Sequence, residues 1–548
     1  MSGRFVRSSK YRHVYGNPAK KDVSFDNVKV SNNAWDTNLL SSSGKYLSLN
    51  WNTAGGGAFA LIPTERPGKL PDLYPLCRGH TSAVLDTAFS PFDDYVVASG
   101  GDDGHIALWN VPIEQLNDAL ESPRAKDGGV EDIKPVATFH GGRRRVGHVE
   151  FHPTAANVLA AATGDHAVKL FDVEKRVSRV DLGGFTDSIQ SLTFDWTGSL
   201  LAATCRDRKL RLFDTRSRDV QTTDCHGGIK GARAVWCGDK PRLITTGFSK
   251  MSERQMFLWD VTQLSKPIRT VSLDSSNGII MPFWSDNNIC FLAGKGDGNV
   301  RYYELDSDEL HYLAEYKSVE PQSGMTFLPR RALNADDNEI ARAYKVTYST
   351  IQPVSFYVPR KADSFQEDIY PPAPSTEPAL TADEFFDGKT SSPNLLDFGS
   401  RTVISGSETQ PIKIDTPPAP KLDDPPKAKE VPKDEPAVPK DESKVQEESK
   451  VQEEPKIQKE EPKAQEEPKA QEEPKSQEEP KAQKEEPKVS SDVQKSAPSE
   501  PTAAAGAAVG AAAGAAAGAT DKSTIDSLKT QIADRDAHIR DLEIEISK

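Results

Sequence analysis

Five segments of this chain share one strand-like ending, in which apolar and polar residues alternate and an aromatic residue stands third from the end. They are IALWNV (106–111), VKLFDV (168–173), LRLFDT (210–215), MFLWDV (256–261) and VRYYEL (300–305). In four of them an Asp precedes the aromatic residue by six positions: Asp103, Asp165, Asp207 and Asp297. A unit that recurs every 42–62 residues indicates a repeat architecture, in which neighbouring units complete one another's core.

The repeat predicts an all-β fold, a seven-bladed WD-repeat β-propeller. The unit that ends at Trp109 is the clearest, and we place its signature in the last of four strands. Another such strand is expected at 58–63, and 324–359 contains three more strand-like runs. Because an unpaired sheet edge attracts other chains, the last blade needs completion. We expect the segment around 11–16 to supply the missing strand.

Four residues of the clearest unit predict a buried hydrogen-bonded chain. Asp103 can accept from His80, which can bond to Ser99 and through it to Trp109. Such a chain stabilises a blade when every member is satisfied. A catalytic triad uses the same Ser, His and Asp, but no second nucleophile or oxyanion loop accompanies them. We therefore interpret these residues as structural and predict no catalytic residue.

Composition divides the chain into four parts. Residues 1–360 are predicted to form the propeller, and 361–405 an extension packed on it, with plain linker as the alternative. Residues 406–520 are predicted to be a disordered Pro/Glu/Lys-rich and Ala/Gly linker, because PKAQEEP-like repeats stop helices and bury little apolar surface. Besides the spacer interpretation, PPAP (417–420) and DDPPKAK (423–429) can be ligands of an aromatic groove.

The last 28 residues, 521–548, are predicted to form a short coiled coil. An isolated helix of this length is marginal in water, so its apolar stripe needs a partner. The alternative is one amphipathic helix that docks on the propeller. Apolar residues recur at the a and d positions of a heptad: Ile525, Leu528, Ile532, Ile539, Leu542 and Ile546.

Charge and cysteine content exclude several classes of protein. The net charge is −14, whereas residues 1–50 carry 8 Lys or Arg and 3 Asp. This pattern does not suggest nucleic-acid binding and suits contact with an acidic protein surface. Five irregularly spaced Cys indicate neither disulfides nor zinc, so we predict no metal and no cofactor. Without a signal peptide or an 18-residue apolar run, we expect a cytoplasmic protein with no membrane span.

Less regular segments between the repeats resemble the coronin family closely. The likeness covers roughly residues 1–400 and, in type, the terminal helix. The matching segments are SSKYRHVYGNPAKKD, GGGAFALIP, PLCRGHTSAVLDTAFSPFDD, GFSKMSERQMFLWD, LDSSNGIIMPFW, GKGDGNVRYYE, EPQSGMTFLPRR and VPRKADSFQEDIYP.

The resemblance implies a protein that binds and cross-links actin filaments through an oligomerising coiled coil. It also implies contact with the actin-related-protein nucleation complex and action alongside cofilin on filament turnover, in cortical actin patches. Linkers of some fungal relatives are thought to bind microtubules. Whether the oligomer is a dimer or a trimer, and whether nucleation is inhibited or promoted, stays open.

The resemblance also points to a filament contact near the N-terminus. In several coronins an Arg before the first Trp-Asp pair matters for filament binding, and Lys29 holds that place in NVKVSNNAWD. Lys keeps the charge but loses the bidentate fork of Arg. The neighbouring cations are predicted to add to one positive face: Arg4, Arg7, Lys10, Arg12, Lys20 and Lys21.

Two other classes of function compete with this hypothesis. A general WD-repeat scaffold or adaptor without actin specificity would need an adaptor-binding box, which we do not find in the sequence. A propeller enzyme would need clustered carboxylates, ligating side chains or a phosphate loop. The stretch AGKGDG (293–298) lacks the glycine spacing of such a loop.

Overall fold

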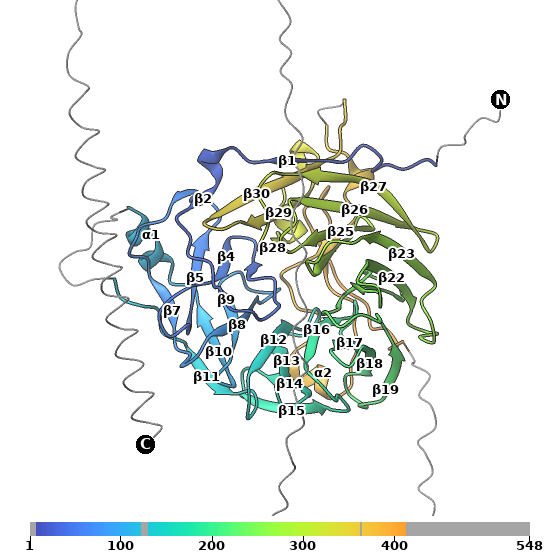
Figure 1. Cartoon of the computed structure of the whole chain (residues 1–548), viewed down its shortest axis with the longest axis horizontal. Helices are drawn as coiled ribbons and strands as arrows, with labels where there is room; N and C mark the ends of the chain where they lie inside the picture. The colour runs from blue at the N-terminus through green and yellow to red at the C-terminus, as the bar shows by residue number, and fades with distance from the viewer. Residues whose placement is uncertain (1–6, 122–129, 362–363, 413–548) are drawn as a thin grey trace, which may run out of the picture. The chain divides into compact units, whose positions relative to one another are not determined.

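Seven β-sheets stand in a ring around a central channel, one sheet per blade (Figure 1). They belong to a computed structural model that describes residues 7–121, 130–361 and 364–412. The predicted fold, a seven-bladed propeller, is confirmed. The predicted linker and coiled coil fall outside the described residues.

Blades one to three follow in chain order, and in each the first strand lines the channel. Blade one contains β3 (Leu40–Ser42), β4 (Tyr46–Asn50), β5 (Ala58–Pro63) and β7 (Leu76–Arg78). Blade two contains β8 (Val84–Phe89), β9 (Val96–Gly101), β10 (His105–Asn110) and β11 (Ala137–His140), with helix α1 (Ile113–Glu121) before β11. Blade three contains β12 (Val146–Phe151), β13 (Val158–Thr163), β14 (Ala167–Asp172) and β15 (Val177–Leu182).

Blades four to six repeat this order. Blade four contains β16 (Ile189–Phe194), β17 (Leu200–Cys205), β18 (Lys209–Asp214) and β19 (Val220–Asp224). Blade five contains β20 (Arg233–Trp236), β21 (Arg242–Phe248), β22 (Arg254–Asp260) and β23 (Arg269–Asp274). Blade six contains β24 (Ile280–Ser285), β25 (Ile289–Gly294), β26 (Asn299–Asp306) and β27 (Glu309–Lys317).

Blade seven is completed by the N-terminal segment, as predicted. Strands β28 (Gly324–Phe327), β29 (Glu339–Val346) and β30 (Thr350–Tyr357) pair in chain order. Both β1 (Tyr15–Pro18) and β2 (Phe25–Asp26) pair with β30, and β2 also pairs with β6 (Gly68–Lys69). The paired residues of β1 overlap the predicted 11–16 at Tyr15 and Gly16 and continue to Pro18. Tyr11 and Val14 are instead buried against the blade six and seven core.

The signature strand is the third of each blade, and our placement of it in the last strand was wrong. Strands β10, β14 and β18 each have a neighbour on both sides, and a fourth strand follows them in the chain. The place of the third strand inside the sheet explains why its sequence carries the signature. A third strand is covered on both edges and keeps most residues buried, whereas the outer strand β15 exposes four of its six residues.

The propeller has two faces, which we name by their turns. The upper face holds the turns between second and third strands and the connections between blades, and the lower face holds the remaining turns. On the upper face the turn at Gly104 has φ +78°, and a Cβ there would meet a carbonyl oxygen of Gly142 at 2.7 Å. Only glycine therefore permits this close approach of two connections.

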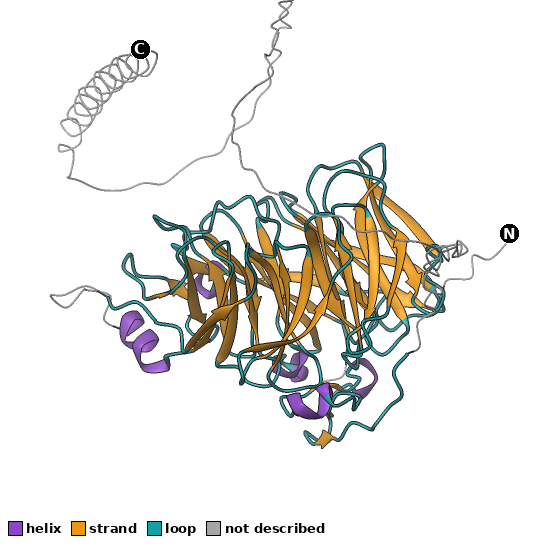
Figure 2. Ribbon diagram, turned by 90° about the horizontal axis from the view of Figure 1, so that it is seen from below, coloured by secondary structure: helices purple, strands orange, loops and turns teal. Residues whose placement is uncertain are grey.

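An arm formed by residues 358–412 crosses the lower face from blades six and seven to blades three and four. It contains β31 (Ala373–Pro374), α2 (Ala382–Phe386), β32 (Leu395–Leu396) and β33 (Val403–Ile404). Asn287 of blade six donates to the carbonyl oxygen of Ile369 at 2.6 Å. Phe385 of α2 is 1% exposed in the core shared by blades three and four. In Figure 2 most of the helical turns lie below the sheets.

Candidate functional site

The Ser, His, Asp and Trp singled out in blade two form one buried chain. His80 Nδ1 lies 3.1 Å from Asp103, His80 Nε2 lies 2.8 Å from the Ser99 hydroxyl, and the Trp109 indole donates to that hydroxyl at 2.8 Å. Ser99 is fully buried, so no substrate reaches its oxygen. Burial alone would raise the pKa of Asp103, but hydrogen bonds from His80 and two backbone N–H groups hold it below its usual range. The arrangement fastens a blade and leaves no exposed nucleophile.

A second chain of this kind lies in blade five, and sequence reasoning missed it. His226 Nε2 lies 3.0 Å from the Thr245 hydroxyl, to which the Trp259 indole donates at 2.9 Å. The signal was available, because the His and the hydroxyl residue are 19 positions apart in both blades. The hydroxyl-to-Trp spacing is 10 in blade two and 14 in blade five, where the turn after β21 is longer.

Blade four replaces the histidine chain with an ion pair. Arg211 donates to both oxygens of Asp207, at 3.1 and 2.6 Å, and its guanidinium lies 4.8 Å from the ring centroid of Phe185. Although burial opposes it, this bidentate pairing lowers the pKa of Asp207 to about 2. Asp207 thus keeps the signature position with a different partner.

The predicted N-terminal cations do not share one surface. Arg7 pairs with Glu304 and Asp306 at the end of β26, Lys10 donates to the Asp368 carbonyl oxygen at 2.9 Å, and Arg12 donates to the Arg7 carbonyl oxygen. These contacts fasten the N-terminal segment to blade six and the arm. Arg4 lies outside the described residues.

The remaining three predicted cations are exposed as the chain rises along the rim of blade seven to the upper face. Lys20 and Lys21 follow β1, and Lys29 follows β2. Lys29 borders a hollow of about 520 Å³ between blades seven, one and two. Leu73, 56% exposed, contributes apolar surface to this hollow, and Asp132 pairs with Arg78 at 2.7 Å across it. Lys29 therefore presents its charge beside an apolar surface.

Three successive arginines at the upper mouth of the channel were not anticipated. Arg143, Arg144 and Arg145 lie in the connection between β11 and β12 and are exposed. Arg145 pairs with Asp102 at 3.1 Å and lies 5.2 Å from the ring of Trp35. The run GGRRR was visible in the sequence, but only the fold places it on the same face as Lys29.

Residues 34–37 cover the channel mouth beside these arginines. The Trp35 indole donates to the Gly147 carbonyl oxygen at 2.8 Å, and a Cβ on Gly147 would lie 2.4 Å from the Trp35 ring. The Asp36 carboxylate pairs with Lys295 at 3.2 Å, and its backbone carbonyl accepts from Arg233. Charge pairs and one close ring contact thus hold this segment in place.

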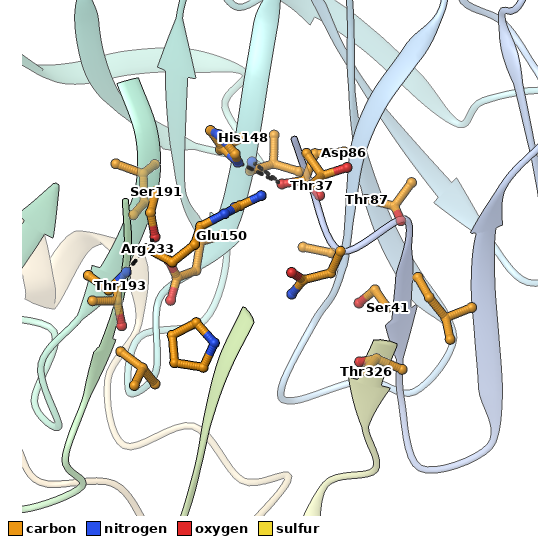
Figure 3. A pocket seen from close by; sticks show the side chains of 18 residues that line it. Thr37, Ser41, Asp86, Thr87, His148, Glu150, Ser191, Thr193, Arg233 and Thr326 are labelled. Carbon is orange, nitrogen blue, oxygen red and sulfur yellow. Dashed lines mark hydrogen bonds and ion pairs between the residues drawn. The ribbon is translucent and has the colours of Figure 1, made fainter. Parts of the chain in front are cut away.

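Beneath it lies a polar cavity of about 280 Å³ (Figure 3). Hydroxyl groups of the innermost strands line it, together with Asp86, His148, Glu150 and Arg233. Burial raises the pKa of Glu150 to about 8 and lowers that of His148. Within the described residues no group of three or more His, Cys, Asp or Glu could hold a metal ion. We find no nucleophile paired with a base in the cavity.

The six predicted oligomerisation residues, Ile525 to Ile546, lie outside the described residues. Among the described helices, none has the length and hydropathy to span a membrane.

Comparisons with known proteins agree with this architecture. The family model for the WD domain, G-beta repeat, matches residues 73–110 and 177–214, and a type of WD40 repeat matches 351–393. A domain of unknown function, DUF1899, matches residues 4–69, the segment that completes blade seven and contains Lys29.

Curated relatives identify the family. A coronin-like protein of Schizosaccharomyces pombe is 50% identical over 423 residues, which cover 76% of this chain and 69% of the relative. The chain belongs to the coronin family. The coronin-like protein of Saccharomyces cerevisiae is 47% identical over 74% of this chain, and the match spans 62% of its own length. The solved WD40 domain of Toxoplasma gondii coronin superposes with a TM-score of 0.64 at 29% identity, covering 73% of this chain and 98% of that domain.

Proposed function

We propose that this coronin binds actin filaments through its upper face and cross-links them as an oligomer. Its partners in this role are actin filaments and, for filament turnover, the actin-related-protein nucleation complex and cofilin. The linker is a candidate microtubule contact. The observation that carries the proposal is Lys29, which is exposed on the upper face and borders a hollow to which Leu73 contributes apolar surface.

Charge supports this choice of face. Arg143 and Arg144 stand exposed on the same face as Lys29. An acidic filament would be attracted by these cations, and such attraction speeds association and sets orientation more than it adds affinity. Leu73 offers apolar surface that an approaching partner would bury.

Cross-linking requires more than one propeller per molecule. If 521–548 joins two or three chains, a second propeller binds at a high effective concentration once the first is bound. Deleting 521–548 should therefore weaken filament pelleting of the full chain. Equal pelleting by both proteins would remove the avidity argument.

The site assignment is tested by charge reversal. Lys29→Glu should reduce pelleting about tenfold, equivalent to ~1.4 kcal/mol, with an unchanged melting temperature. Lys266→Glu is the matched control, since Lys266 is an exposed lysine in the connection between β22 and β23 on the lower face. If both variants pellet alike, Lys29 is not a contact. If the wild-type chain does not pellet at all and instead retrieves other complexes, a general scaffold is the better assignment.

A further inference from the structure

An apolar cavity of about 380 Å³ opens at the lower mouth of the channel. The ends of successive innermost strands and the turns after them supply its aromatic residues. They are Phe89, Phe151, Phe194, Trp196, Trp236 and Trp284. Cavities of this size, lined by aromatic residues with few polar groups, are typical ligand sites.

Two prolines of the arm already pack at this cavity. Pro374 of β31 and Pro393, which is buried, form part of its wall. The apolar C–H groups of a proline ring pack well on the face of an indole, and aromatic grooves that bind proline-rich segments use this property. The mouth is thus built to receive extended, proline-containing chain.

In the described part of the chain, one indole N–H group at the cavity is free to donate a hydrogen bond to a ligand. The Trp236 indole donates to the Lys240 carbonyl oxygen at 3.0 Å, whereas the Trp196 indole has no acceptor among the described residues. Trp196 is half-buried at the cavity. A polyproline II segment has no internal hydrogen bonds, so its carbonyl oxygens are free to accept from such an N–H group.

The chain's own sequence provides a matching segment close by. Ile412, the last described residue of the arm, packs against the cluster that contains Trp236, which also lines the cavity. The stretch Pro-Pro-Ala-Pro-Lys occupies 417–421. Five residues of extended chain reach at most ~18 Å, so Pro417 can lie no farther than this from Ile412.

The carboxyl groups among the lining residues offer no free charge to this segment. Asp286 pairs with Arg330 at 3.5 Å, and burial raises the pKa of Glu150 to about 8. Recognition of the Pro-Pro-Ala-Pro-Lys stretch therefore depends on apolar contact with the aromatic residues.

We propose that residues 417–421 of this chain dock in the lower-mouth cavity and stack on Trp196 and its neighbours. The start of the linker is then part of the propeller's lower surface. This inference is independent of filament binding by the upper face.

The test uses the full-length chain and its tryptophan fluorescence, to which three of the seven Trp contribute from this cavity. Pro417→Ala/Pro418→Ala/Pro420→Ala should shift the emission to longer wavelength and increase acrylamide quenching. The matched control, Pro462→Ala/Pro468→Ala/Pro474→Ala in the distal repeats, should leave both unchanged.

A synthetic peptide of residues 415–424 separates the possible occupants. It should bind the triple-proline variant and restore its emission, and should not bind the wild-type chain, whose cavity is filled. A peptide that carries Pro417→Ala/Pro418→Ala/Pro420→Ala should bind more weakly, and adding Trp196→Ala to the variant should abolish binding. Equal peptide binding by wild type and variant would mean that the cavity is open to another protein's segment. Binding to neither would mean that it is no peptide site, and either result overturns the proposal.

Discussion

The two faces of the propeller are built from different interactions. The lower face is covered by the arm, whose Phe385 lies 4.3 Å from the buried ring of His152 and whose Leu380 pairs with Ala155. The upper face presents exposed Lys29, Arg143 and Arg144. Burial of apolar groups stabilises a fold, whereas exposed charges contribute little to stability and much to recognition. We therefore expect the contacts of the lower face to stabilise the fold and the cations of the upper face to bind a partner.

The largest expected effect is on the lower face. Phe385→Ala removes a fully buried ring and should cost about 3–5 kcal/mol locally. Because α2 belongs to the arm, faster hydrogen exchange should appear first over 373–393. Phe386→Ala, at a half-buried neighbour, is the control and should have a smaller effect. Unchanged exchange in the Phe385 variant would show that the arm is held by other contacts.

A smaller loss is expected inside the blades. Ser99→Ala leaves the His80 and Trp109 nitrogens buried without their shared partner and should cost ~1–3 kcal/mol. Thr245→Ala should act similarly in blade five, and the two losses should add because the sites share no partner. Urea denaturation of both single variants and the double variant measures this. A neutral Ser99→Ala would mean that packing alone holds blade two.

Acid should loosen the lower face before the upper one. Burial lowers the pKa of His152 to about 3, and its Nδ1 accepts from the Ala155 N–H at 2.9 Å. In the unfolded chain His152 takes up a proton near its ordinary pKa of 6.5, whereas in the folded chain it stays neutral. The contribution of neutral His152 to the free energy of unfolding is therefore complete above pH 6.5 and is lost as the pH falls toward 3. The slope is at most ~1.4 kcal/mol per pH unit. Exchange of 373–393 at pH 7 and pH 5 measures it, and His152→Gln should flatten the difference. If the protection of residues 373–393 against exchange is the same at both pH values, His152 does not have this role.

The smallest effect on stability is expected on the upper face. Arg143→Glu/Arg144→Glu should change the free energy of unfolding by no more than ~0.5 kcal/mol. Filament pelleting should nevertheless fall, and the wild-type interaction should weaken as salt rises. Lys266→Glu again serves as the control. If pelleting survives the double reversal, the arginine run belongs to another function.

Much of the fold could be predicted because its signal is local. The Asp-to-aromatic spacing marks a turn and the strand after it, and His80, Ser99, Asp103 and Trp109 lie within 30 residues. The position of that strand in the blade could not be read, because the outer strands are half exposed and variable, and β7 and β11 follow their third strands at a distance. The His226 chain was missed although its His-to-hydroxyl spacing matches that of blade two, because Thr replaces Ser and the turn before Trp259 is longer.

The candidate site was harder to predict because it depends on residues far apart in sequence. Lys29 could be singled out by resemblance, but its apolar neighbour Leu73 and its shared face with Arg143 depend on the closed ring. Conversely, Arg7 has the charge expected of a binding residue, but Glu304 and Asp306, almost 300 positions away, use that charge to fasten the chain. Sequence shows which side chains carry charge and does not show which are already paired.

Hydrogen exchange of the full-length chain, with and without actin filaments, tests the division of roles between the faces most directly. We predict that filaments protect 27–31, 51–53 and 143–145 on the upper face, together with 72–78 in the hollow beside Lys29, and leave 373–393 on the lower face unchanged. Protection confined to the arm, with the upper segments unaffected, would contradict the account.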